Sequence, residues 1–95
     1  MSDALIKDLT ERENQKKIIL EIGESCFCLL VYIAKNQPSR SKFLEEEPLV
    51  IMEDFGYSKE KFYRLKRKCE KAGYLISEGT HPGPNSPRLR IKVTL

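Results

Sequence analysis

The sequence SKEKFYRLKRKCEKAGYLI, residues 58–76, specifies one helix and the strand that follows it. Ser58 is a favoured N-cap residue, and the spacing of apolar side chains predicts a helix from Ser58 to Ala72. Gly73 supplies the left-handed residue at which many helices end. Residues 74–77 then have the composition of a β-strand. A helix that leads directly into a strand is therefore the first firm element of the fold.

The predicted helix has one apolar face and one basic face. On a helical wheel Phe62, Leu65 and Cys69 fall, with Ala72, within about 80° and predict the buried stripe. The opposite face is rich in Arg and Lys, which suits nucleic acid because Arg fits the guanine edge and Lys binds phosphate. The simpler alternative is a solvated helix. The predicted nucleic-acid contacts are Lys59, Glu60, Tyr63, Arg64, Lys66, Arg67 and Lys71.

The charge of the chain is strongly divided between its two halves. Residues 1–57 carry 7 Lys and Arg against 11 Asp and Glu, a net charge of −4. Residues 58–95 carry 10 against 3, a net charge of +7. A basic half can neutralise phosphates, and an acidic half opposes unspecific binding. The division favours a nucleic-acid partner over a neutral one.

The composition indicates an ordinary globular protein of one domain. Hydrophobic residues make up 40% and charged residues 33% of the 95 residues. Residues 1–10 alternate apolar side chains with Asp and Lys and lack the apolar centre of a signal peptide. The most apolar stretch, residues 26–34, is far too short to span a membrane. We therefore expect a cytoplasmic protein with no membrane partner.

The sequence offers little support for a metal site or an enzyme. Three cysteines, Cys26, Cys28 and Cys69, are an odd number and suggest buried thiols rather than a disulfide framework. On a helix Cys26 and Cys28 lie roughly 200° apart and cannot converge on one ion. No carboxylate pair, Ser/His/Asp set or Gly-rich phosphate loop stands out. We expect no metal, no cofactor and no catalytic activity.

Two further segments precede the basic helix. Pro48 suits the first position of a helix that continues through residues 49–55 and is closed by Gly56. With the basic helix this segment predicts a helix-turn-helix over residues 48–73. Residues 41–47 are polar, and we expect one or two helical turns there.

The N-terminal half predicts a long apolar helix over residues 18–36, preceded by an extension over residues 1–17 that holds a short helix or the start of the longer one. Gly23 allows a kink or break, and Ser25 can cap a second piece. The apolar side chains form two neighbouring stripes, more than one small domain is expected to cover by itself. The second stripe predicts a homodimer, with an interface formed by Ile18, Ile19, Ile22, Phe27, Leu30 and Val31.

The C-terminal residues predict a β-hairpin, residues 74–95. Residues 79–87 hold two Gly and three Pro and form its loop. Residues 88–95 alternate apolar and polar side chains, which is typical of a half-buried antiparallel strand. The polar face of this strand is basic and suits phosphate. The predicted nucleic-acid contacts of the hairpin are His81, Arg88, Arg90 and Lys92.

The pattern Ser-x-x-x-φ-x-Arg-Leu at residues 58–65 resembles the recognition helix of winged helix-turn-helix regulators such as the MarR and PadR groups. The pattern Glu-x-x-Gly-φ-φ at residues 70–75, which Ile76 follows, resembles the start of their first wing strand. The resemblance implies that Tyr63, Arg64 and Arg67 face the major groove of DNA. The loop over residues 79–87 would then lie near the minor groove or the backbone. Two features depart from the pattern. The Glu45–Glu47 run with Pro48 lengthens the segment before the helix-turn-helix, and no C-terminal dimerisation helix follows the last strand.

Together these patterns predict a single domain, residues 1–95, that is mainly α with a small C-terminal β-hairpin: a winged helix-turn-helix. The expected function is sequence-specific binding of double-stranded DNA by a dimeric transcriptional regulator. Two alternatives are open: a winged-helix module that binds another protein in a larger assembly, and an architectural or replication protein that binds DNA without base specificity.

Overall fold

A computed structural model of the chain describes residues 3–78 and 89–95. Over these residues the protein is mainly helical, with five helices and one small antiparallel sheet. The predicted fold class is confirmed at this level. In chain order the elements are α1 (Asp3–Thr10), α2 (Arg12–Ile22), α3 (Glu24–Asn36), β1 (Leu44–Glu46), α4 (Pro48–Phe55), α5 (Lys59–Lys71), β2 (Leu75–Glu78) and β3 (Leu89–Val93).

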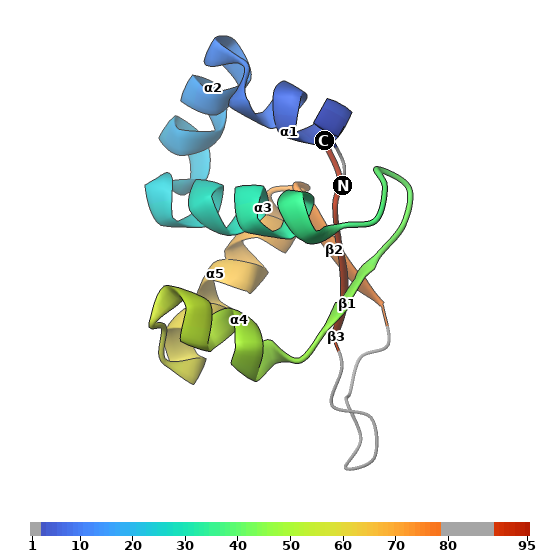
Figure 1. Ribbon diagram of the computed structural model, residues 1–95. Coiled ribbons are helices and arrows are strands. Elements are labelled where there is room, and N and C mark those ends of the chain that lie inside the picture. Colours follow the sequence, from blue (N-terminus) through green and yellow to red (C-terminus); the bar gives the residue numbers. More distant parts are fainter. Residues whose placement is uncertain (1–2, 79–88) are drawn as a thin grey trace.

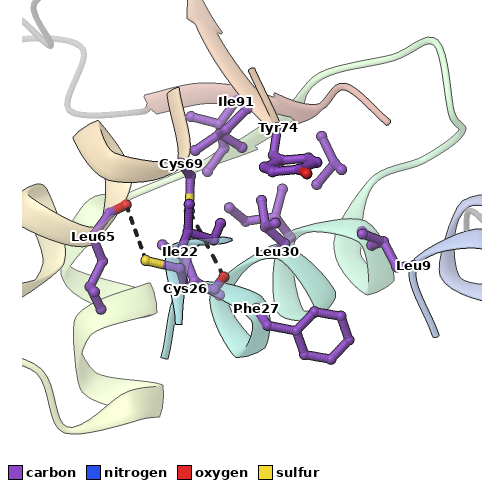
Figure 2. Close-up of a cluster of buried hydrophobic side chains, with 14 of the residues drawn as sticks. Leu9, Ile22, Cys26, Phe27, Leu30, Leu65, Cys69, Tyr74 and Ile91 are labelled. Carbon is purple, nitrogen blue, oxygen red and sulfur yellow. Dashed lines mark hydrogen bonds between the residues drawn. The ribbon is translucent and has the colours of Figure 1, made fainter. Parts of the chain in front are cut away.

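Helix α3 is the centre of the molecule. It lies between the α1–α2 pair on one side and α4 with α5 on the other, while the sheet covers one end of the helices (Figure 1). Leu29, Leu30 and Ile33 of α3 are fully buried. The buried side chains of all eight elements join around α3 in one apolar cluster, part of which is shown in Figure 2.

Residues 18–36 form parts of two helices rather than one long helix, with the break at Gly23 that the sequence allowed. The chain breaks at Gly23, whose φ of 92° is a conformation that glycine adopts without strain. Residues 18–22 therefore belong to α2, and α3 starts afresh at Glu24 without a side-chain cap from Ser25. Residues 3–10 form the short helix that the sequence allowed, α1, and they belong to the core rather than to an extension, because Leu5 and Leu9 are fully buried.

The segment predicted as helical turns over residues 41–47 instead contains strand β1. Leu44 is buried and lies opposite Ile91, and the strand pairs antiparallel with β3. The long-range pairing outweighs a weak local preference. Strand β3 is central in the order β1-β3-β2, so the predicted two-stranded hairpin is part of a three-stranded sheet.

Strand β3 confirms the predicted alternation. Leu89, Ile91 and Val93 are buried, while Arg90 and Lys92 lie on the outer face. The strand ends at Val93, before the predicted end at residue 95. Leu95 lies beyond it and is exposed, so it does not continue the buried face.

Helices α4 and α5 meet in a short turn. Pro48 is the first residue of α4, as predicted, and Gly56 ends this helix with a φ of 69°. Ser58 is the N-cap of α5, and its hydroxyl oxygen accepts a hydrogen bond from the Lys61 backbone N–H at 3.2 Å. The start of α4, its end at Gly56 and the N-cap of α5 are therefore confirmed.

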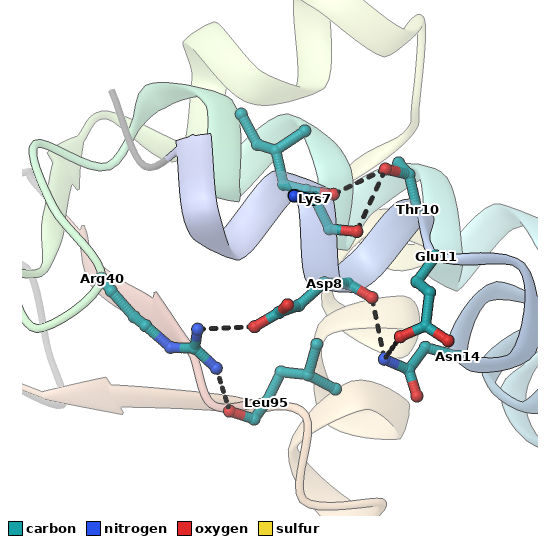
Figure 3. Close-up of polar contacts among 8 residues, drawn as sticks. Lys7, Asp8, Thr10, Glu11, Asn14, Arg40 and Leu95 are labelled. Atoms are coloured by element: carbon teal, nitrogen blue, oxygen red, sulfur yellow. Dashed lines mark hydrogen bonds and ion pairs between the residues drawn. The ribbon is translucent and has the colours of Figure 1, made fainter.

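The Arg40 side chain connects α1 with Leu95, which follows β3. The Arg40 guanidinium pairs with the Asp8 carboxylate at 2.6 Å and donates to the backbone carbonyl of Leu95 at 3.0 Å (Figure 3). On the other side of Asp8, its backbone carbonyl accepts from the Asn14 side-chain amide at 2.9 Å.

None of the helices within the described ranges is long and apolar enough to cross a membrane.

Candidate nucleic-acid interface

Helix α5 is held in place by the apolar face that the sequence predicts. Phe62 and Cys69 are fully buried and Leu65 nearly so, packed against α3 and β2. The Cys69 thiol lies 3.9 Å from the backbone carbonyl of Cys26, and the Cys26 thiol lies 4.0 Å from that of Leu65 (Figure 2). Burial is the main reason that the pKa of the Cys69 thiol is raised well above its usual range, and the neighbouring Cys26 thiol raises it further. This face is structural, and it fixes which side of α5 meets solvent.

The opposite face of α5 presents four cations to solvent. Arg64, Arg67, Lys68 and Lys71 are all exposed. Within residues 3–78 and 89–95 none of them forms an ion pair. They line, with Glu70, a shallow depression of about 650 Å³ along the helix. We call these four residues the α5 basic face. Its charge is available to an anionic partner.

The first turns of α5 add a second, smaller depression of about 300 Å³, lined by Lys59, Glu60, Tyr63 and Arg67. Lys59 and Glu60 are exposed. The Tyr63 side chain is partly buried, because its ring packs edge-on against the ring of Phe62, with the two ring centroids 5.1 Å apart. Tyr63 nevertheless lines this depression, and its contact with DNA stays a prediction.

Lys66 does not lie on the basic face. Its ammonium pairs with the Glu70 carboxylate at 2.8 Å and with the Ser77 hydroxyl at 3.3 Å, and its side chain is 12% exposed. The Ser77 hydroxyl donates to the other Glu70 oxygen at 3.1 Å. These contacts join α5 to β2 and use the charge of Lys66 within the protein, so its contact with nucleic acid stays a prediction that the structure does not favour. The helical wheel already indicates this location, because Lys66 lies about 40° from Phe62, next to the buried stripe.

The outer face of the sheet is also less basic than predicted. Arg90 lies between two carboxylates, with Nε 3.0 Å from Glu45 and a terminal nitrogen 2.8 Å from Glu78. Its guanidinium lies 5.1 Å from the ring centroid of Phe43, at the same distance as the Lys92 ammonium. Two carboxylates of the protein thus compensate the charge of Arg90, which is not the unpaired cation that the sequence predicts, and its contact with phosphate stays a prediction.

Of the other predicted nucleic-acid contacts in the hairpin, Lys92 alone lies within the described residues. Lys92 is half-buried and forms no ion pair among the residues that the structure describes. The predicted contacts His81 and Arg88 lie outside the described residues. The contribution of the hairpin loop therefore stays a prediction.

The side chains predicted to form a dimer interface lie mostly inside the chain. Ile18, Ile22, Phe27 and Leu30 are buried, and Ile19 and Val31 are partly buried. The prediction is wrong for the four buried residues. The prediction assumed that one of the two apolar stripes of residues 18–36 is not covered by the rest of the chain. In the structure α1, α5 and the sheet pack against both stripes. The exposed apolar side chain of this region is Leu20, at 77%. Dimerisation itself stays a prediction.

The thiols and acids do not assemble into a metal site in the part of the chain that the structure describes. No group of three or more His, Cys, Asp or Glu side chains there converges on one point. Cys26 is buried and Cys28 exposed, which places them on different sides of α3.

Comparison of the chain with protein-family models, with curated proteins and with solved structures finds no match. The geometry and charge of α5 and its surroundings are therefore the features that bear on function.

Proposed function

We propose that this protein is a winged helix-turn-helix that binds double-stranded DNA through α5, as a transcriptional regulator. The observation that carries the proposal is the α5 basic face, four exposed cations on one side of a helix whose other side is buried. A buried stripe prevents the helix from rotating, so its cations keep one direction. Such an arrangement suits a long polyanion.

The dimensions of α5 support insertion into the major groove. This groove admits one α-helix, and Arg is the side chain best shaped to contact O6 and N7 of guanine. Arg64 and Arg67 are three residues apart and lie on the same side of the helix. Lys68 and Lys71, farther along, suit phosphates. The helix therefore combines side chains for base contact with side chains for backbone contact.

The surroundings of α5 support the winged helix-turn-helix architecture. Helix α4 leads through the turn at residues 56–58 into α5, and the strands β2 and β3 follow it directly. This order agrees with the resemblance noted from the sequence. The third strand, β1, places Glu45 beside Arg90 and adds acid to the sheet face. We propose that α5 supplies most of the DNA contact within the described residues.

The test is selection of bound duplexes from a random pool, repeated at two salt concentrations. A regulator enriches a defined sequence, and its affinity falls as salt rises because bound cations are released. Binding without enrichment would indicate an architectural protein instead. Absence of binding would refute the proposal and favour a protein-interaction module.

We further propose that the regulator is a homodimer, with Leu20 at the contact in place of the buried residues. Light scattering at micromolar concentration should give twice the 11.0 kDa mass of the chain. Leu20→Lys should restore the single mass without loss of stability, because this side chain is 77% exposed. A single mass for the unmodified protein would refute dimerisation and leave DNA binding as a separate question.

A further inference from the structure

Helix α5 carries two acidic residues that differ in their surroundings. Glu70 is used within the protein, where it pairs with Lys66 and accepts from Ser77. Glu60 is exposed and forms no ion pair or hydrogen bond among the described residues, although Arg64 lies one turn away. Glu60 lies in the first turn of α5, where a carboxylate suits the positive end of the helix dipole, and it also borders the α5 basic face.

The position of Glu60 places it on the line of the basic face. Counting 100° per residue, Glu60 falls about 20° from Arg67 and about 40° from Arg64. It also lines the same depression as Arg67. Whatever approaches the arginines therefore also approaches this carboxylate.

A carboxylate at this place discriminates among the groups of DNA. Phosphates offer no donor and repel it, so Glu60 weakens contact with the backbone. In the major groove cytosine offers its N4 amino group, which Glu can accept from. Adenine also has an amino group, but its N7 acceptor lies beside it and opposes a carboxylate.

We infer that Glu60 is a specificity-determining residue that selects cytosine in the major groove, next to a guanine contacted by Arg64. This inference rests on the proposed function. The two residues are four apart, about 6 Å along the helix, which corresponds to about two base pairs. The selected site should therefore contain cytosine within about two base pairs of the guanine whose preference Arg64→Ala removes.

The experiment compares duplex selection by the unmodified protein with selection by Glu60→Gln, Glu60→Asp and Glu13→Gln. Glu13 is the matched control, because it is exposed and occupies the same second position of its helix, α2, as Glu60 does in α5. Glutamine pairs with adenine through N6 and N7. Glu60→Gln should thus change the preference at one position from cytosine to adenine and bind unrelated DNA more tightly.

Glu60→Asp keeps the charge and its favourable place in the first turn but withdraws the carboxylate by one methylene. It should lose about tenfold of the cytosine preference while its affinity for unrelated DNA stays unchanged. Circular dichroism checks that each variant is folded.

Three results would overturn the inference. The first is an unchanged base preference in Glu60→Gln, and the second is the same change in Glu13→Gln. In both cases the unmodified protein still selects a sequence, so the proposed function stands. The third is that the unmodified protein selects no sequence, which refutes the proposed function together with this inference.

Discussion

Helix α5 and strand β3 both carry basic side chains on one face, yet the two faces differ in the charge they leave available. Arg64 and Arg67 of α5 have no carboxylate partner among the described residues, whereas Arg90 of β3 has two, Glu45 and Glu78. A strand in the middle of a sheet has neighbours on both sides, and each can place an acid opposite a cation. An exposed helix face meets only its own residues three and four positions away. Basic residues in a sequence are therefore better indicators of a binding surface on a helix than on a central strand.

The largest expected effect comes from the arginines of α5. Arg64→Ala should relax base preference at one position per site, with a loss of about 1–3 kcal/mol of discrimination. Arg67→Ala should act in the same way at a second position. Neither change removes a buried group, so the unfolding transition should be unaltered. Fluorescence anisotropy with the selected duplex and with duplexes changed at single positions measures both effects.

Lys68→Ala is the control for these variants, since it removes an exposed charge from the same helix. It should lower the affinity for all duplexes alike. Equal effects of Arg64→Ala and Lys68→Ala on every sequence would mean that α5 contacts only phosphates, and the regulator proposal would give way to an architectural protein.

A smaller effect distinguishes Lys66 from the basic face. Lys66→Ala removes contacts with Glu70 and Ser77 and should lower the free energy of unfolding by about 1 kcal/mol. The DNA affinity of the folded protein should change little. Urea unfolding followed by circular dichroism, beside anisotropy, separates the two quantities. A variant of full stability and reduced affinity would return Lys66 to the basic face.

Stability at alkaline pH tests the packing of the fold independently of the α5 basic face. The hydrogen bond from the Tyr74 hydroxyl to Glu21, at 2.6 Å, together with burial, raises the pKa of Tyr74 to about 12. Burial and the hydrogen bond to Asp54 raise the pKa of Tyr32 to about 12. Unfolded tyrosine titrates near 10. The folded chain therefore holds protons that the unfolded chain has released, and its stability should fall from about pH 10 to about pH 12.

Urea midpoints across this window should decrease less steeply in Tyr74→Phe, which cannot lose the proton. A slope equal to that of the unmodified protein would show that Tyr74 does not contribute to this loss.

The elements predicted well from the sequence are those defined by neighbouring residues. The cap at Ser58, the buried stripe of Phe62, Leu65 and Cys69, and the proline at the start of α4 are all local patterns. The alternation in β3 likewise identified its buried face. These patterns sufficed for the mainly helical class and for the orientation of α5.

The errors arise where distant segments meet. Strand β1 forms because Leu44 can pair with Ile91, 47 positions later, and nothing near residue 44 shows this. The neutralisation of Arg90 by Glu45 follows from the same pairing. Four of the six predicted dimer residues are buried because α1, α5 and the sheet pack against α2 and α3, which residues 18–36 alone do not indicate. The internal pairing of Lys66, by contrast, had a local signal, because Lys66 lies beside the buried stripe and four residues before Glu70.

The most direct test of the account compares the salt dependence of DNA binding in two double variants, Lys68→Ala with Lys71→Ala on α5 and Arg90→Ala with Lys92→Ala on the sheet. Each pair removes two positive charges. If the α5 basic face binds the phosphates, the first pair should reduce the slope of log affinity against log salt by about two units and the second should leave it unchanged. An equal or larger reduction from the sheet variants would contradict the central claim that α5, rather than the outer face of the sheet, holds the DNA.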